Sequence, residues 1–250
     1  MGLKEKVAQT ILSNTVRPKR RKFGVEIENF YYKRGTVERI PVNDENYFSA
    51  SKLLESVNSA VNANSQYSYS LEPGGQLEWA SGPSTSLWEI KNQFDENILI
   101  QEKLCKSNEI DIGYFSVEPV SMPFDIRLID SEKYRLMNDL FIKTGDLGPW
   151  MMRNTTSIQI NLDFTDEEDA SQMAFVADAI QPLMSIMFSN SPFMNAKPTR
   201  ENLRWKIWGN TDNSRCGSLY DHSINTPKNF VEKYAEWLLQ RDVIFLDNMD

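Results

Sequence analysis

The sequence has 250 residues, 40% hydrophobic and 25% charged, so it can bury a substantial core without disulfides or structural metals. Two cysteines and one histidine exclude a disulfide framework, a zinc cluster and any site that needs several imidazoles. The net charge of −8 argues against a general nucleic-acid binder, and no apolar run reaches the ~20 residues of a membrane span. A catalytic metal would have oxygen ligands, which favours Mg²⁺, Mn²⁺ or Ca²⁺.

The N-terminal segment predicts a short amphipathic helix over residues 3–14 and lacks the apolar centre of a secretory signal. The basic run at residues 17–22 is interpreted as a solvated segment before the first strand. No repeat or linker divides the chain. We therefore expect one catalytic-type domain over residues 1–250, located in the cytoplasm.

Residues 22–30 alternate between apolar and polar positions, which predicts a half-buried strand with Glu26 and Glu28 on its polar face. Residues 46–63 suit a helix. Two strand-like runs at 67–72 and 76–81 flank Pro-Gly-Gly, and this predicts a hairpin because glycine supplies the positive φ of the turn.

Helical spacing of apolar residues predicts helices over 86–108 and 131–144, with a strand over 110–118 between them. A further strand is predicted over 156–164, where polar and apolar residues alternate again. Its apolar face consists of Ile158, Ile160, Leu162 and Phe164.

Two helix starts are predicted from capping signals. Thr165 and Glu168 have the spacing of a capping box, which would open a long helix to about Asn190. Thr226 as N-cap and Pro227 at the first helical position would open the last helix. Because several strands alternate cleanly, we expect an α+β fold with a mostly antiparallel sheet, one polar face and helices packed outside.

Four carboxylates belong to this polar face. Glu26 and Glu28 lie two residues apart on one strand, about 6.5–7 Å along the backbone. Glu72 and Glu78 flank the hairpin turn. Such a cluster repels itself unless a cation lies among its members, and Mg²⁺ is the natural choice. An exposed polar strand face is the alternative, but two glycines after a proline are a costly choice for a plain turn.

Groups of opposite charge occur later in the chain. Arg153 is expected to open the strand that carries Gln159 and Asn161 on its polar face, and Arg204 and Arg215 follow later in the sequence. Arginine suits phosphate and carboxylate, and carboxylate-held magnesium with arginines is typical of phosphoryl transfer. The familiar glycine-rich nucleotide loops are absent from the sequence. Trp205 and Trp208, three residues apart, have the spacing of a helix core face.

Four segments resemble the glutamate–cysteine ligase family of the plant and proteobacterial type. They are "FGVEIENF", "SLEPGGQLEWAS", "MMRNTTSIQINLDF" and "SPFMNAKPTRENLRWKIWGNTDNSRCG", in family order over about residues 20–220. The resemblance implies a curved sheet like that of glutamine synthetase. It also implies ATP-dependent ligation of L-glutamate to L-cysteine through γ-glutamyl phosphate, the first step of glutathione synthesis, with Mg²⁺ or Mn²⁺.

The resemblance also implies roles for individual residues. Glu26, Glu28, Glu72 and Glu78 fall on the family's metal-binding positions. Gln159, Asn161, Arg204, Trp208 and Asp212 fall on substrate- and nucleotide-binding positions, and we assign catalytic roles to Arg153 and Arg215. No histidine is placed to deprotonate the cysteine amine, and no general base is assigned.

The family usually continues well past the point where this sequence stops. A fragment, a naturally short member and a chain whose site is completed by a second polypeptide are all compatible with that. Two other functions remain open, namely ligation to another amine and non-catalytic nucleotide binding. No nucleic-acid or membrane partner is expected.

Overall fold

The computed structural model describes residues 1–62, 64–200 and 202–245, and within them five strands form one antiparallel sheet. The strands are β1 (Phe23–Lys33), β2 (Ser68–Leu71), β3 (Leu77–Ala80), β4 (Ile110–Gly113) and β5 (Ile158–Leu162). The predicted α+β class and the predicted hairpin are confirmed, since β2 and β3 pair antiparallel across the Pro-Gly-Gly turn.

The long central strand β1 organises the sheet. Its first half lies between β3 and β5, and its second half pairs with β4. In this register Glu28 lies opposite Glu78 on β3, and Glu26 lies opposite Gln159 on β5. The strand ends three residues later than predicted, because Phe30, Tyr31 and Tyr32 are buried and keep β1 paired as far as Lys33.

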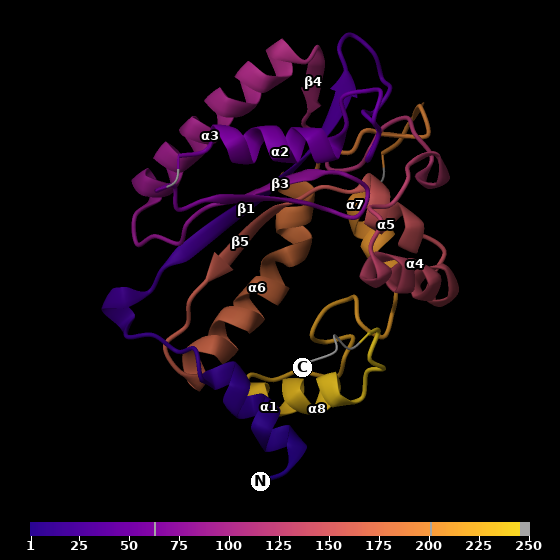
Figure 1. Ribbon diagram of the computed structural model, residues 1–250. Coiled ribbons are helices and arrows are strands. Elements are labelled where there is room, and N and C mark those ends of the chain that lie inside the picture. Colours follow the sequence, from indigo (N-terminus) through magenta and orange to yellow (C-terminus); the bar gives the residue numbers. More distant parts are fainter. Residues whose placement is uncertain (63, 201, 246–250) are drawn as a thin grey trace.

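Helices surround the sheet (Figure 1). They are α1 (Leu3–Leu12), α2 (Ala50–Ala60), α3 (Leu87–Ser107), α4 (Glu132–Thr144), α5 (Gly148–Asn154), α6 (Glu167–Met187), α7 (Leu203–Gly209) and α8 (Phe230–Leu239). Short 3-10 turns occur at Pro18–Arg20 and Pro123–Asp125, and a small hairpin pairs β6 (Phe193–Met194) with β7 (Lys197–Pro198). In the described part of the chain no helix is both long and apolar enough to cross a bilayer.

The core lies between the sheet and the helices α2 and α3, which cover one face (Figure 1). Leu53 and Val57 of α2 are fully buried. The ring of Trp79 on β3 packs against the ring of Phe94 on α3, with ring centres 5.8 Å apart. Helices α6, α1 and α8 lie on the other side of the sheet (Figure 1). Burial of these apolar side chains on one face leaves the polar residues of β1 and β3 on the opposite face.

Strand β5 differs from the rest of the sheet because α2 and α3 do not cover it. Ile160 lies opposite Val25, so it is on the apolar side of the sheet, yet 62% of its surface is exposed. Ile158 and Leu162 are 71% and 57% exposed. The alternation of this strand was predicted correctly, but its apolar face has no covering layer in the described residues.

Several predicted boundaries were wrong for local reasons. The helix predicted over 46–63 begins only at Ala50, because the Asp44 carboxylate accepts hydrogen bonds from the backbone of Asn46 and Tyr47 and forms a turn there. The strand predicted over 110–118 ends at Gly113.

The two predicted helix caps were also wrong. Asp166, one residue after Thr165, caps α6 by accepting from the Asp169 backbone N–H at 2.9 Å, and α6 ends at Met187. Helix α8 begins at Phe230 after Asn229, which has a left-handed φ of 56°. Thr226 instead accepts from the Lys228 backbone in the preceding turn.

Candidate active site

The polar face of the sheet brings three predicted metal ligands together by backbone geometry alone. Glu26 and Glu28 point to the same side of β1 because they are two residues apart. Glu78 joins them because the β1–β3 register sets it directly opposite Glu28. Directly opposed residues have Cβ atoms about 4.5–5.5 Å apart, so these side chains are neighbours.

Each of these three carboxylates accepts a hydrogen bond from a side chain on an adjacent strand or its extension. Asn161 Nδ2 donates to Glu26 Oε1 at 2.7 Å, and Ser157 Oγ donates to Glu28 Oε1 at 2.7 Å. Ser70 Oγ donates to Glu78 Oε1 at 2.8 Å. These donors hold the acidic side chains in place and offset part of their mutual repulsion.

Sequence reasoning found Asn161 but missed the two serines. Both follow from the same alternation, since Ser157 shares a face with Gln159 and Asn161, and Ser70 lies opposite Glu78. Gln159 donates to Asn161 Oδ1 at 3.0 Å and so supports the contact to Glu26. The predicted pair Gln159 and Asn161 thus lies beside the carboxylates.

Glu72 enters the same region from the hairpin turn. Its backbone closes the turn, with Glu72 N donating to Gln76 O at 2.9 Å and Gly75 N donating to Glu72 O at 2.8 Å. Gly75 has φ +79°, which glycine adopts without strain. Burial first, and then the charges of Glu28 and Glu78, raise the pKa of Glu72 to about 7.

The four carboxylates lie close enough for their charges to act on one another. Glu26, Glu28 and Glu78 all raise the pKa of Glu72, and Lys133 on α4 opposes them. Burial raises the pKa of Glu28, while the hydrogen bond from Ser157 and the charge of Arg204 lower it. Yet among residues 1–62, 64–200 and 202–245 no group of three or more His, Cys, Asp or Glu side chains is arranged so that it could hold a metal ion. Glu26, Glu28 and Glu78 accept hydrogen bonds from protein side chains instead.

Arg204 is the predicted cation that the structure places nearest to this face. Its Nε donates to the Thr156 carbonyl at 3.0 Å, and its charge acts on Glu28. Burial lowers the pKa of Arg204, and Glu28 partly restores it. The guanidinium lies 5.6 Å from the ring centre of Trp208, within cation–π range.

The helical core predicted for Trp205 and Trp208 was wrong. Both rings are exposed, at 42% and 37%, because Leu203 and Ile207 form the buried face of α7. Helix α7 itself was not predicted. The Trp208 ring is therefore partly exposed beside Arg204.

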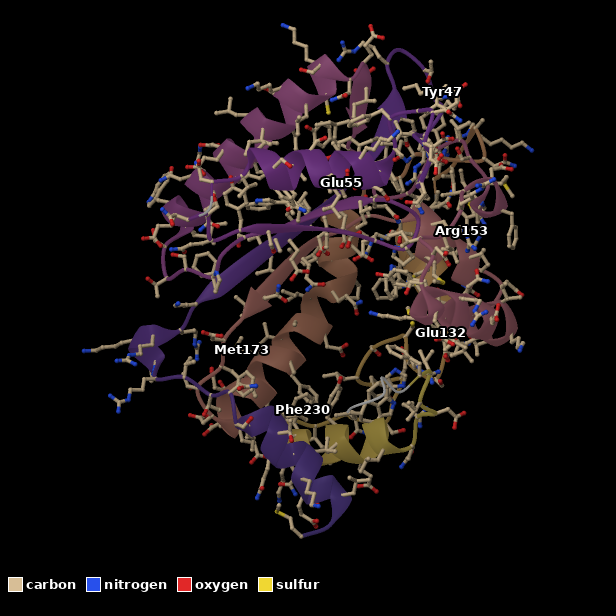
Figure 2. The ribbon with its side chains drawn as sticks, viewed as in Figure 1. Tyr47, Glu55, Glu132, Arg153, Met173 and Phe230 are labelled. Atoms are coloured by element: carbon tan, nitrogen blue, oxygen red, sulfur yellow. The ribbon has the colours of Figure 1, made fainter. Side chains whose placement is uncertain are left out.

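Arg153 does not open strand β5 as predicted, because it belongs to the last turn of α5. Its Nε donates to the Ile126 carbonyl at 3.1 Å, its guanidinium lies over the Phe124 ring, and burial lowers its pKa. Its backbone touches the hairpin, since a Cβ on Gly74 would come within 2.7 Å of Arg153 Cα. Figure 2 labels Arg153 and, on α4, Glu132, both on the same side of the molecule.

Asp212 and Arg215 form an ion pair in the loop after α7. Asp212 is 3% exposed and also accepts from the Ser214 backbone at 2.9 Å. Arg215 Nη2 donates to the Asp242 carbonyl at 2.6 Å. In the described residues the contacts of Arg215 therefore hold the C-terminal segment and do not lead to the sheet carboxylates.

The fold and the site define a class of protein, namely an α+β chain whose antiparallel sheet presents a cluster of carboxylate oxygens beside a half-buried arginine. The chain belongs to glutamate–cysteine ligase family 2, whose family model matches residues 22–247. The resemblance predicted from four sequence segments is thereby confirmed.

Known relatives agree with this membership. The chain is 31% identical to glutamate–cysteine ligase A, chloroplastic, of Oryza sativa subsp. indica over 232 residues, which cover 90% of this chain and 46% of the relative. It is 28% identical to the chloroplastic glutamate–cysteine ligase of Nicotiana tabacum over 273 residues, which cover 99% of this chain and 52% of the relative. It is 33% identical to the chloroplastic glutamate–cysteine ligase of Arabidopsis thaliana over 184 residues, which cover 71% of this chain and 34% of the relative. The chain spans about half the length of the curated relatives it matches.

Proposed function

We propose that this chain carries the acidic half of a ligase site that joins the γ-carboxylate of glutamate to the amine of cysteine at the expense of ATP. The observation that supports it most is the convergence of Glu26, Glu28, Glu72 and Glu78 on one sheet face beside Arg204. The relatives are named as glutamate–cysteine ligases. A sheet curved like that of glutamine synthetase, and a cytoplasmic location, are parts of the same proposal.

The proposed reaction has two steps. A γ-carboxylate oxygen of glutamate attacks the γ-phosphorus of ATP, the bond to the bridging oxygen breaks, and ADP leaves with that electron pair. The neutral amine of cysteine then attacks the acyl carbon of γ-glutamyl phosphate. Inorganic phosphate leaves, the amine loses a proton to solvent or to a base, and γ-glutamylcysteine remains.

The donor set fits Mg²⁺, or Mn²⁺ in its place. Carboxylates are the protein ligands that these ions prefer, and a carboxyl with a pKa of about 7 has neighbours that a dication would neutralise. Glu26, Glu28, Glu72 and Glu78 would hold the ion, exchanging some of their present hydrogen bonds for metal bonds. When bound, the ion supplies neutralisation of phosphate charge.

The remaining residues have roles that follow from where they lie. Arg204 is half-buried and beside Glu28, so it would neutralise transferring phosphoryl oxygens. The exposed Trp208 ring would bind a planar ligand group. Gln159 and Asn161 would orient the carboxylates and the nucleotide. Arg153, beside the hairpin turn, would bind a carboxylate of the substrate, whereas Arg215 would act only after release from Asp212.

Phosphate release from ATP in the presence of Mg²⁺ tests this function. We expect release that requires both glutamate and cysteine and that is lost in Glu28→Gln. Serine or another small amine in place of cysteine tests the related ligases with a different acceptor. Release that is indifferent to both amino acids, or equal in Glu28→Gln, would contradict the proposal.

A second candidate is a partner-dependent form of the same site. The exposed apolar face of β5 favours it. In this case the chain alone would bind ATP with Mg²⁺ but release no phosphate. Adding a polypeptide equivalent to the part of the rice relative that this chain does not span would restore release.

A further inference from the structure

Arg39 is a buried cation that lies outside the carboxylate face and was not singled out from the sequence. It follows the turn after β1, where it forms an isolated bridge with Tyr32, and it is 7% exposed. Its guanidinium packs over the Phe30 ring at 4.7 Å. Burial lowers the pKa of Arg39 to about 10, so it is still charged at neutral pH.

The guanidinium joins two segments that are far apart in the sequence. Nη2 donates to the Gly74 carbonyl at 2.7 Å, and Nη1 donates to the Arg153 carbonyl at 2.8 Å. The first carbonyl belongs to the hairpin turn that follows Glu72, and the second to the last turn of α5. A planar fork can make both bonds at fixed geometry, which an ammonium group cannot do.

The turn is pressed against α5 where Arg39 binds it. A Cβ added to Gly74 would lie 2.9 Å from the Arg153 carbonyl oxygen, so the approach needs glycine. Gln76 Nε2 donates to the Thr155 carbonyl at 2.9 Å, and the Ile129 N–H donates to the Pro73 carbonyl at 2.8 Å. The hairpin is thus fixed from several sides, with Arg39 as the charged contact.

Burial of the Arg39 guanidinium is unfavourable in free energy. Arg39 is buried, and its two hydrogen-bond acceptors are neutral carbonyls. The carboxylate of Glu118 is itself 0% exposed and accepts from the backbone N–H groups of Val120 and Ser121. Its charge offsets only part of the effect of burial on the pKa of Arg39. Burying a charge lowers stability unless it is well compensated, and an apolar side chain would often serve stability as well. What the guanidinium contributes is a fixed placement of the hairpin turn relative to α5.

We propose that Arg39 is a positioning residue, which holds the turn carrying Glu72 at a fixed place relative to Glu28 and Glu78 and keeps Arg153 beside it. The inference rests on the proposed function, because it assigns Glu72 to the metal site. Among the described residues, the hydrogen bonds of Arg39 go to the backbone carbonyls of Gly74 and Arg153 and not to the four carboxylates. Arg39 acts through the backbone of the hairpin.

Mn²⁺ binding to the full chain, followed by the electron paramagnetic resonance signal of free Mn²⁺ at pH 8, tests this role. Groups that orient metal ligands change affinity by about 10–100-fold, so Arg39→Met should weaken Mn²⁺ binding by at least tenfold. Arg39→Lys should fall between Arg39→Met and the unaltered chain, since it keeps the charge but not the fork.

Arg34→Met is the matched control. Arg34 Nη2 also donates to two backbone carbonyls, those of Cys105 at 3.0 Å and Ile110 at 3.3 Å, but these carbonyls belong to α3 and β4 rather than to the hairpin. This variant should bind Mn²⁺ within about twofold of the unaltered chain, because these contacts lie away from the hairpin and exposed polar contacts contribute little energy. Urea unfolding of every variant separates lost affinity from lost fold.

The outcomes are distinct. Mn²⁺ affinity that falls tenfold in folded Arg39→Met but not in Arg34→Met supports the inference. Unchanged affinity in Arg39→Met overturns it, and if that variant does not fold, unchanged affinity in Arg39→Lys does so. No Mn²⁺ binding by the unaltered chain would overturn the proposed metal site itself, and the inference with it.

Discussion

The two sides of strand β1 differ in how they are covered. On the β3 side, α2 and α3 seal the apolar face, and Trp79 and Leu53 are 1% and 0% exposed. On the β5 side, Ile160 is 62% exposed, and Ile186 near the end of α6 is 70% exposed. Both sides contribute polar residues to the same site, so the site joins a packed half of the molecule to an open one.

This difference shows what an alternating pattern can and cannot predict. Alternation states which residues share a face, and it does so equally well for β1 and β5. Whether a second layer lies on that face depends on other segments. Exposed apolar patches of this kind commonly mark interaction surfaces, and an edge strand with free backbone groups is a template for pairing.

Truncation of a core side chain should give the largest contrast between the two halves. Trp79→Ala should lower the free energy of unfolding by about 3–5 kcal/mol, because it removes a ring packed against Tyr67 and Phe94. Ile160→Ala should change it by no more than about 0.5 kcal/mol. Urea denaturation followed by circular dichroism measures both. Equal losses would mean that β5 is covered in solution.

Hydrogen exchange should separate the halves without mutation. Backbone amides of β1 and β3 should exchange only through global unfolding, since their strands are paired on both sides. Amides in the last two turns of α6, where Leu183 and Met187 are exposed, should exchange on the order of 100-fold faster. Mass spectrometry of peptides from each segment checks this. Uniform protection would contradict the contrast.

The acidic face should make stability depend on pH. The folded-state pKa of Glu72, about 7, lies above its ordinary value of 4.5, so the folded chain binds more protons between these values. The contribution of Glu72 to stability should therefore be fully present below pH 4.5 and should fall by about 2 kcal/mol as pH rises from 4.5 to 7, since solvent screens part of the effect. Glu72→Gln should flatten this dependence. A profile that is equally steep in the variant would remove Glu72 as its cause.

Helix caps should give the smallest contrast. Ser49 caps α2 in the packed half by accepting from Lys52 N, and Asp166 caps α6 in the open half. Ser49→Ala should cost about 1 kcal/mol of global stability. Asp166→Ala should mainly increase local exchange at the start of α6, whereas Thr165→Ala should do less. If Thr165→Ala has the larger effect, the cap is misassigned.

Much of the site was predictable because it depends on periodicity and turn chemistry. The shared face of Glu26 and Glu28 follows from a period of two, and the hairpin that Gly74 and Gly75 indicate sets Glu78 opposite Ser70. The pairing of β3 with β1 then sets Glu78 opposite Glu28. A shift of β1 by one residue would move Glu26 and Glu28 to the other face of the sheet.

The remaining features depend on contacts between distant segments. Arg39 is a lone arginine after a turn, and only the fold brings it to Gly74 and Arg153. Arg153 was misplaced because α5 is short and its Pro149 signal lies just before a strand-like run. Asp166 and Thr165 are both good N-caps, and the sequence does not say which one is used.

The central claim is that four carboxylates on one sheet face bind a divalent cation, and direct Mn²⁺ binding tests it most closely. At pH 8 the unaltered chain should bind Mn²⁺ saturably, with Mg²⁺ competing. Glu28→Gln and Glu72→Gln should each weaken binding by tenfold or more, to about the same extent, while Glu55→Gln on α2 leaves it unchanged. Binding that is absent, or that survives in both site variants, would contradict the account.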